Sequence, residues 1–144
     1  MVRTVSLPTY AAAEEFSVQT PDGLITANDD LLWADAPERA VTLQLATQLD
    51  DILSATVGPE PWPFAGLPDA AVDVRVADML AGADGTYRLS GQFYVGGDGR
   101  DYRNSATTFD IVVPIADLTP ATVVAAQGDA VRQLAETIAR QLGR

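Results

Sequence analysis

Asp35-Ala-Pro-Glu38, which directly follows Leu31-Leu-Trp33-Ala34, is the stretch that decides the fold. It marks the point at which an extended, partly buried segment becomes an amphipathic helix. Asp35 is expected to cap this helix, because its carboxylate can accept hydrogen bonds from the first free backbone N–H groups. Pro37 suits the first turn, where no donor is lost. Glu38, three residues after Asp35, completes a variant of the capping box.

Two helices are predicted. The first runs from about Ala36 to Ala55 and is ended by Gly58-Pro59. Its apolar stripe consists of Val41, Leu45, Leu49, Ile52 and Leu53. The second helix is capped and started by Thr119-Pro120 and stopped by Gly143. Its predicted buried stripe consists of Val123, Val124, Val131, Leu134, Ile138 and Leu142.

Strands are predicted before the first helix. A short strand over Val2–Leu7, with Val5 and Leu7 on one face, is stopped by Pro8. The run Tyr10–Glu15 is ambiguous, because its alanines would tolerate a helical turn. A hairpin and a polar loop follow, made of Phe16–Thr20, the turn Pro21-Asp22-Gly23, Leu24–Ala27, and then Asn28–Asp30 leading into Leu31.

Three longer strands are predicted after a Pro-rich surface loop, Glu60–Pro68. Val72–Val76 alternates apolar and charged residues, which is typical of a sheet with one wet face. A looser connection, Asp78–Gly85, leads to a strand whose inner set is Tyr87, Leu89, Gly91, Phe93 and Val95. A hairpin turn, Gly96–Gly99, leads to a return strand from about Asp101 to Pro114, in which one face carries Thr107, Phe109, Ile111 and Val113.

This order of elements predicts the fold class α+β. We expect an antiparallel β-sheet with two amphipathic helices packed on one face, as a two-layer sandwich. The length of 144 residues suits a single domain, 1–144, with its own core. No internal repeat, long linker or second domain is visible in the sequence.

Composition excludes several classes of function. Nine basic and 20 acidic residues give a net charge of −11, and such a surface repels phosphate backbones and anionic lipid headgroups. Nucleic-acid binding is therefore not expected. The chain has no Cys and no His, which excludes disulfides, thiolate nucleophiles, cysteine zinc sites and Ser-His-Asp triads. No cofactor, no resident metal and no catalytic residue are predicted.

The start of the chain leaves two compartments open. No apolar run approaches the roughly 20 residues that a membrane helix needs, and Met1–Pro8 lacks the long apolar region of a signal peptide. Either the protein is cytosolic, or the chain begins after a removed export segment.

The two tryptophans are candidates for interaction sites. Trp33 is expected in the core, beside the helix that it introduces, although aromatic residues also anchor partners. Trp62 stands between two prolines, so strand alternation cannot bury it. It either folds back under the loop or presents an exposed apolar patch to a protein or lipid. The candidate partner or lipid surface consists of Trp62, Pro63, Phe64 and Leu67.

Charged residues give weaker signals. The oxygen-bearing residues after the Gly-Gly pair do not have the spacing of an EF-hand, so they are interpreted as solvated turn residues, namely Asp98, Asp101 and Asn104. Asn28–Asp30 is interpreted in the same way. Chance pairs of carboxylates are abundant among 20 acids, and no motif singles out a glycosidase pair. Arg75 and Arg88 are expected to form cross-strand surface pairs with acids.

Several motifs stand in a recognisable order along the chain: Val5-Ser-Leu-Pro-Thr-Tyr10, the Trp33-Ala segment leading into Val41, Pro61-Trp62-Pro63, Asp69–Val76, the aromatic-centred Leu89–Val95, and Ala130–Ala139. Together they resemble the PqiC-type family of ABC-transport auxiliary lipoproteins, which accompany MCE (mammalian cell entry) proteins in Gram-negative bacteria. The chain departs from the family at Ala11–Glu15, where members often carry an Asp-Arg pair. It also lacks the export signal and the lipid-bearing Cys with which members begin.

The resemblance implies a PqiC-like periplasmic domain without catalysis or cofactor, tethered to the outer membrane by an N-terminal lipid that is missing from this chain. Its implied partners are an MCE-domain protein and an ABC transporter complex that moves phospholipids or other hydrophobic molecules between membranes. The implied role is docking. Exposed sheet edges could also pair between subunits, which would give a homo-oligomer. Two alternatives stay open: a small carrier that itself binds a lipid between sheet and helices, and an unrelated cytosolic hydrolase.

Overall fold

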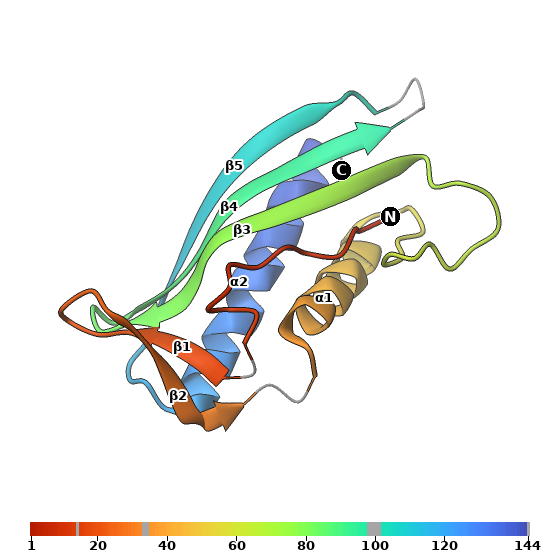
Figure 1. The fold of residues 1–144 in the computed structure, drawn as a ribbon. Coiled ribbons are helices and arrows are strands. Elements are labelled where there is room, and N and C mark those ends of the chain that lie inside the picture. The colour runs from red at the N-terminus through yellow and green to blue at the C-terminus, as the bar shows by residue number, and fades with distance from the viewer. Residues whose placement is uncertain (14, 33–34, 98–101, 144) are drawn as a thin grey trace.

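Residues 1–13, 15–32, 35–97 and 102–143 are described by the structure, which is a computed structural model. These residues form a five-stranded sheet and two helices (Figure 1). In chain order the elements are β1 (Glu15–Gln19), β2 (Ile25–Leu32), α1 (Pro37–Ile52), β3 (Ala70–Gly82), β4 (Thr86–Gly97), β5 (Ser105–Pro114) and α2 (Pro120–Gln141). The predicted order of strands, helix, meander and helix is therefore confirmed.

The sheet is mixed, with the strand order β2-β1-β3-β4-β5. β1 pairs antiparallel with β2, and β3, β4 and β5 form an antiparallel meander. β1 and β3, however, run parallel where Val18 and Gln19 pair with Ala81 and Gly82. The α+β two-layer prediction is confirmed, but an entirely antiparallel sheet was wrong at this one junction. The segment containing α1 is long enough to make the crossover that parallel neighbours require.

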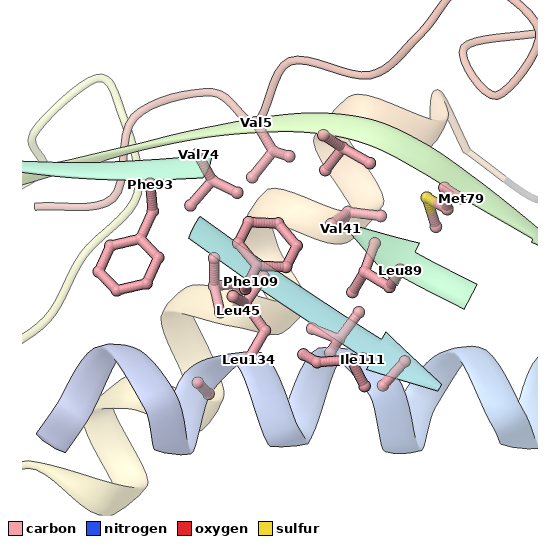
Figure 2. Packing of buried hydrophobic residues seen from close by; sticks show 14 of the residues in the cluster. Val5, Val41, Leu45, Val74, Met79, Leu89, Phe93, Phe109, Ile111 and Leu134 are labelled. Atoms are coloured by element: carbon pink, nitrogen blue, oxygen red, sulfur yellow. The ribbon is translucent and has the colours of Figure 1, made fainter. Parts of the chain in front are cut away.

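Both helices lie on the same side of the curved sheet (Figure 1). α2 packs against β4, β5 and α1. Figure 2 shows side chains of the sheet meeting Leu45 of α1 and Leu134 of α2. The rings of Phe93 and Phe109 lie 6.4 Å apart between centroids, within this core. Burial of these large apolar groups is the main source of stability for such a sandwich.

The N-terminal segment lies along the first half of β3, where β1 does not reach. Arg3 N donates to Val72 O at 2.8 Å and Ser6 N donates to Val74 O at 3.0 Å. Between these two residues, Val5 N donates to Thr42 Oγ1 of α1 at 2.9 Å. The predicted strand is therefore only a set of isolated bridges. Val5 and Leu7 are nevertheless both buried, as their alternation predicted.

The start of α1 differs from the prediction. Ala36, not Asp35, occupies the N-cap position, and among the described residues no side chain caps the helix. The Asp35 carboxylate instead accepts from Ala36 N at 2.8 Å and pairs with Arg39. The capping box with Glu38 is therefore also absent from the described hydrogen bonds. Pro37 stands in the first turn, as predicted.

The helices differ from the predictions at three points, the end of α1, one position in the stripe of α2 and the cap of α2. α1 ends at Ile52, three residues earlier than expected, because the backbone of Leu53 is already extended. Gly143 stops α2 with a φ of +86°, as predicted. Val124, predicted in the buried stripe of α2, is 50% exposed. Thr119 is the N-cap residue of α2, but its hydroxyl donates to Asp117 Oδ1 at 2.6 Å rather than capping the helix.

Two predicted loops are strand. β3 continues through Asp78 to Gly82, so most of the expected connection Asp78–Gly85 pairs with β4. A register shift between Val76 and Asp78 explains the difference, because it breaks the alternation by one residue. β2 likewise includes Asn28–Asp30, for which a loop was predicted. The Pro-rich loop and the turn at Gly23, which has a φ of +82°, are confirmed.

Candidate functional site: an apolar loop and pocket at one end of the sandwich

The loop between α1 and β3 is fastened to the N-terminal segment. Val2 N donates to Gly58 O, and Glu60 N donates to Val2 O, both at 2.8 Å. The Glu60 carboxylate accepts from Thr4 N at 3.1 Å. Figure 1 shows this loop at the same end of the sheet as both chain termini. The candidate residues therefore stand on a loop that is fixed at its base.

Trp62, Pro63 and Phe64 fold back over the base of this loop. The rings of Trp62 and Phe64 meet edge to face, with centroids 4.9 Å apart and an interplanar angle of 68°. A Cβ placed on Gly58 would lie 2.9 Å from Pro63 Cδ and 3.1 Å from Phe64 Cε2. Gly58 is therefore required for this close approach. Trp62 is partly buried, and Phe64 is 48% exposed.

Leu67 projects from the same loop and is 88% exposed, more than any other large hydrophobic side chain whose exposure the structure describes. An exposed leucine alone needs no explanation. Leu67 differs because it borders a pocket of about 350 Å³ and also a shallower hollow of about 750 Å³ that includes outer-face residues of the sheet. The four candidate residues thus fall into two groups, with Trp62, Pro63 and Phe64 folded back and Leu67 at the rim.

The pocket is formed where several elements end together. Leu49 and Leu53 come from the end of α1, Ala70 and Val72 from the start of β3, and Leu142 follows α2. Its lining is apolar apart from a few groups, and Asp69 is the one charged side chain among the described lining residues. The remaining lining residues are Met1, Val2, Ala55, Thr56, Val57, Trp62, Leu67, Pro68 and Tyr102.

The polar groups around the pocket are mostly satisfied, with one exception. The Met1 ammonium donates to Ala70 O at 2.8 Å; burial lowers its pKa, and the neighbouring Asp69 carboxylate acts in the opposite direction. Val57 N donates to Asp50 Oδ1 at 2.8 Å. Trp62 Nε1 is buried and has no hydrogen-bond partner among the described residues. An unpaired buried donor is costly and calls for an explanation.

The outer face of the sheet carries both arginines for which cross-strand ion pairs were predicted, Arg75 and Arg88. Arg88 Nη2 and Asp110 Oδ2 lie 2.9 Å apart across β4 and β5, which confirms the cross-strand prediction. The guanidinium holds the pKa of the Asp110 carboxyl below its usual range. Arg75 instead pairs with Asp73 of its own strand, at 3.2 Å, so the cross-strand prediction was wrong there. Its guanidinium carbon also lies 5.1 Å from the centroid of the Tyr94 ring, on the neighbouring strand.

Several other predicted positions lie outside the described residues. These are Trp33, Asp98 and Asp101, together with the side chains of Asn28, Asp29 and Asp30. Asn104 is described, and its side-chain oxygen accepts from Gly97 N at 3.4 Å. Within the described ranges, no three His, Cys, Asp or Glu side chains gather in a way that could hold a metal ion. Neither α1 nor α2 has the length and apolarity of a membrane span.

Sequence reasoning found the loop but not the pocket. Leu49, Leu53 and Leu142 were assigned to helix stripes, and Tyr102 was not singled out at all. A signal was present, because the end of α1, the start of β3 and the end of α2 meet at one end of the sandwich. The size of the gap between them depends on side-chain packing, which the pattern of the sequence does not give.

These features define the structural class of the protein, which is a two-layer α+β sandwich with an apolar loop and pocket at one end. The family model of the ABC-type transport auxiliary lipoprotein component matches residues 1–139. The chain therefore belongs to this family. None of the curated proteins compared with the chain matches it.

Two crystal structures resemble the whole arrangement. One, of an uncharacterized protein, has a TM-score of 0.87 and 21% sequence identity, and the match covers 99% of this chain and 90% of that one. The other, a Xanthomonas campestris protein of the DUF330 family, has a TM-score of 0.79 and 16% identity, covering 98% of this chain and 81% of that one. At these identities the likeness shows the fold alone.

Proposed function

We propose that this protein is a non-catalytic periplasmic accessory subunit of an MCE/ABC-type lipid transport system, and that it acts by docking onto the MCE-domain protein. The observation that carries the proposal is the match of residues 1–139 to an auxiliary lipoprotein component of ABC-type transport. The same description, of a lipoprotein, supports tethering by an N-terminal lipid. We propose that this lipid lies in the outer membrane.

Docking through the loop is supported by its exposed apolar surface. Leu67 is 88% exposed and Phe64 is 48% exposed, on the same loop, whose base is hydrogen-bonded to the N-terminal segment. Contiguous apolar surface that a folded protein leaves exposed commonly marks an interaction site. A loop held at its base also loses little conformational entropy when a partner binds. We therefore assign the docking role to Trp62, Pro63, Phe64 and Leu67.

The dimensions of the pocket favour docking over lipid carriage. Pockets that enclose drug-sized molecules span about 300–1,000 Å³, and a two-tailed phospholipid is larger than such molecules. At about 350 Å³ the pocket is too small to enclose a phospholipid. The interior between sheet and helices is occupied by side chains such as Phe93, Phe109 and Leu134.

The residue inventory supports a role without catalysis. The chain has neither His nor Cys, which removes the most frequent general base and the most reactive nucleophile. It also has no Gly-Lys-Ser/Thr phosphate-binding loop. In the proposed system, ATP hydrolysis belongs to a different polypeptide.

The test is binding to the MCE-domain protein encoded in the same genomic neighbourhood, measured by biolayer interferometry. We expect Leu67→Asp to weaken binding about tenfold or more, as for a residue at the centre of an interface. The matched control is Leu24→Asp, since Leu24 is 65% exposed in the turn between β1 and β2, at the other end of the sheet (Figure 1). It should bind like the wild type.

Native mass spectrometry of the protein extracted from its membrane provides the second arm. A lipid that co-purifies stoichiometrically, together with no detectable affinity for the MCE protein, would contradict docking and favour the carrier. Equal loss of binding in the Leu67 and Leu24 variants would show that the loop is not the docking surface.

A further inference from the structure

The pocket beside Leu67 differs from the other hollows in where it leads. Its lining joins the sheet start at Ala70 and Val72 to the helix ends at Leu49, Leu53 and Leu142. It therefore opens into the layer between sheet and helices, whereas the larger hollow nearby includes Asp73 and Tyr94 of the outer face of the sheet. An apolar group entering the pocket would continue the hydrophobic core of the protein.

The volume limits what can enter. At about 350 Å³ the pocket lies at the low end of the range for small-molecule sites. This space accommodates a large side chain with some of its adjoining backbone. Interfaces between proteins use such sites for a buried anchor residue, surrounded by contacts that exclude water.

Trp62 contributes its ring to the wall of the pocket. Its indole Nε1 is buried and has no partner among the described residues, so a group in the pocket does not reach this donor unless the ring moves. Trp62 therefore acts here as part of the apolar wall, and aromatic side chains of this kind are frequent among the central contacts of protein interfaces.

The charge around the pocket indicates which segments would bind. Asp69 is the charged side chain in the described lining, and Asp50 and Glu60 are hydrogen-bonded to Val57 and Thr4 beside it. The Met1 ammonium is the cation among the described groups at the pocket and is already bonded to Ala70 O, and the whole protein carries a net charge of −11. A partner segment with Arg or Lys beside its apolar anchor would be attracted, and an acidic one repelled.

We propose that the pocket receives one large apolar side chain from an extended segment of a partner protein, that the ring of Trp62 contacts this side chain, and that Arg or Lys residues flank the anchor. The inference rests on the proposed docking function, which it deepens by naming the chemistry of the docking segment. Leu67, at the rim of the pocket, then covers the bound anchor.

The proposal is tested first with model peptides, so that it does not depend on the MCE protein. The probes are the capped peptides Arg-Arg-Leu-Arg-Arg, Arg-Arg-Ala-Arg-Arg and Glu-Glu-Leu-Glu-Glu. The readout is the indole N–H resonance of Trp62, which is one of two tryptophans in the chain and is assigned with Trp62→Phe. We expect a saturable shift with the first peptide. The other two peptides should bind at least about tenfold more weakly.

Two matched variants locate the binding. Ala55 is exposed and lines the pocket, so Ala55→Trp fills it from the rim, whereas Ala65 is exposed on the same loop and lies outside the lining. Ala55→Trp should abolish the peptide-induced shift, and Ala65→Trp should leave it unchanged. Equal behaviour of the two variants, or equal binding of all three peptides, would overturn the proposal.

The same variants separate this inference from the proposed function. If the MCE protein binds wild type and Ala55→Trp equally, docking stands and the pocket is not its anchor site. If the MCE protein does not bind but the first peptide does, docking onto MCE fails while the recognition chemistry stands. Vesicles of phosphatidylcholine form a last arm, because a Trp62 shift with vesicles that competes with the peptide would make the occupant a lipid and overturn the proposal.

Discussion

Gly91 occupies a place in β4 that no side chain could share with the neighbouring strand. A Cβ at this position would lie 2.2 Å from Arg75 O and 3.0 Å from Val76 Cα. This is the point at which the register between β3 and β4 shifts. Phe109 lies opposite Gly91 on β5, and its side chain is buried. The glycine therefore permits the bulge and the close approach of the two backbones.

We expect Gly91→Ala to lower the free energy of unfolding by about 2–3 kcal/mol, because the backbone of β3 has to move to admit the methyl group. Urea denaturation measures this directly. Gly96→Ala is the control in the same strand, since a Cβ there would meet no heavy atom closer than Asn104 Oδ1, at 3.8 Å. It should change stability by less than about 0.5 kcal/mol. Equal effects of the two substitutions would show that the bulge does not depend on glycine.

Tyr87 makes the stability of the fold sensitive to alkaline pH. Its side chain is 2% exposed, and burial raises the pKa of its phenol above the ordinary value of about 10. Since the pKa is higher in the folded than in the unfolded state, this contribution to stability is complete below about pH 10. It is lost as the pH rises above that value, because only the unfolded chain then releases the proton.

Tyr87→Phe should therefore flatten the decline of stability above about pH 10, by up to about 1.4 kcal/mol per pH unit. Urea unfolding at several pH values between about 8 and about 12, a range that brackets the ordinary titration of tyrosine, measures the slope. Tyr10→Phe should remove a smaller part of this decline in stability. Burial raises the pKa of Tyr10 as well, but Tyr10 is less buried than Tyr87. A slope that stays unchanged in Tyr87→Phe would contradict this assignment.

The first turn of α1 offers a test of where the helix begins. Ala36 has the extended backbone of an N-cap residue but no side-chain oxygen, and Asp35 bonds to Ala36 and Arg39 instead. Ala36→Ser should stabilise the protein by about 0.5–1 kcal/mol, because the hydroxyl can accept from a free N–H of the first turn. Thermal unfolding measures the gain.

Asp35→Ala is the matching control for this prediction. It removes an exposed contact and an exposed ion pair, so it should cost less than about 0.5 kcal/mol. The opposite result, with a cost of about 1 kcal/mol for Asp35→Ala and no gain for Ala36→Ser, would place the cap at Asp35.

Periodicity predicted the elements well where one face is buried and the other is wet. Val41, Leu45 and Leu49 of α1, and Phe109, Ile111 and Val113 of β5, are buried as their spacing indicated. The prediction failed where a local irregularity changes the phase. At Val76 and Asp78 the bulge reverses the alternation, so the second half of β3 resembled a loop in the sequence.

The pattern of the sequence does not predict which strands that are distant in the chain pair, or in which direction. Nothing in Val18 or Gln19 distinguishes a parallel neighbour from an antiparallel one, and the choice depends on where α1 returns the chain. The candidate loop was recognisable, because prolines around Trp62 exclude a strand. The pocket was not, because it exists only once Leu53, Val72 and Leu142 have been brought together.

Net charge acts on the protein as a whole. A charge of −11 on 144 residues makes the compact state repel itself, while the unfolded chain spreads the same charges over a larger volume. The described ion pairs, such as Arg88 with Asp110, are exposed and contribute little against this repulsion. Screening by salt should therefore favour the folded state more than it weakens the pairs.

We expect the melting temperature to rise between about 0.01 M and 0.15 M NaCl, over which the Debye length falls from about 30 Å to about 8 Å. Differential scanning calorimetry measures the shift. The double variant Asp22→Asn with Asp51→Asn, at two exposed positions, lowers the net charge from −11 to −9 and should reduce the dependence on salt. Binding to the MCE protein should change in the opposite direction and weaken with salt, because it depends on attraction to cationic flanks. A melting temperature that falls with salt would mean that the surface ion pairs outweigh the excess of carboxylates.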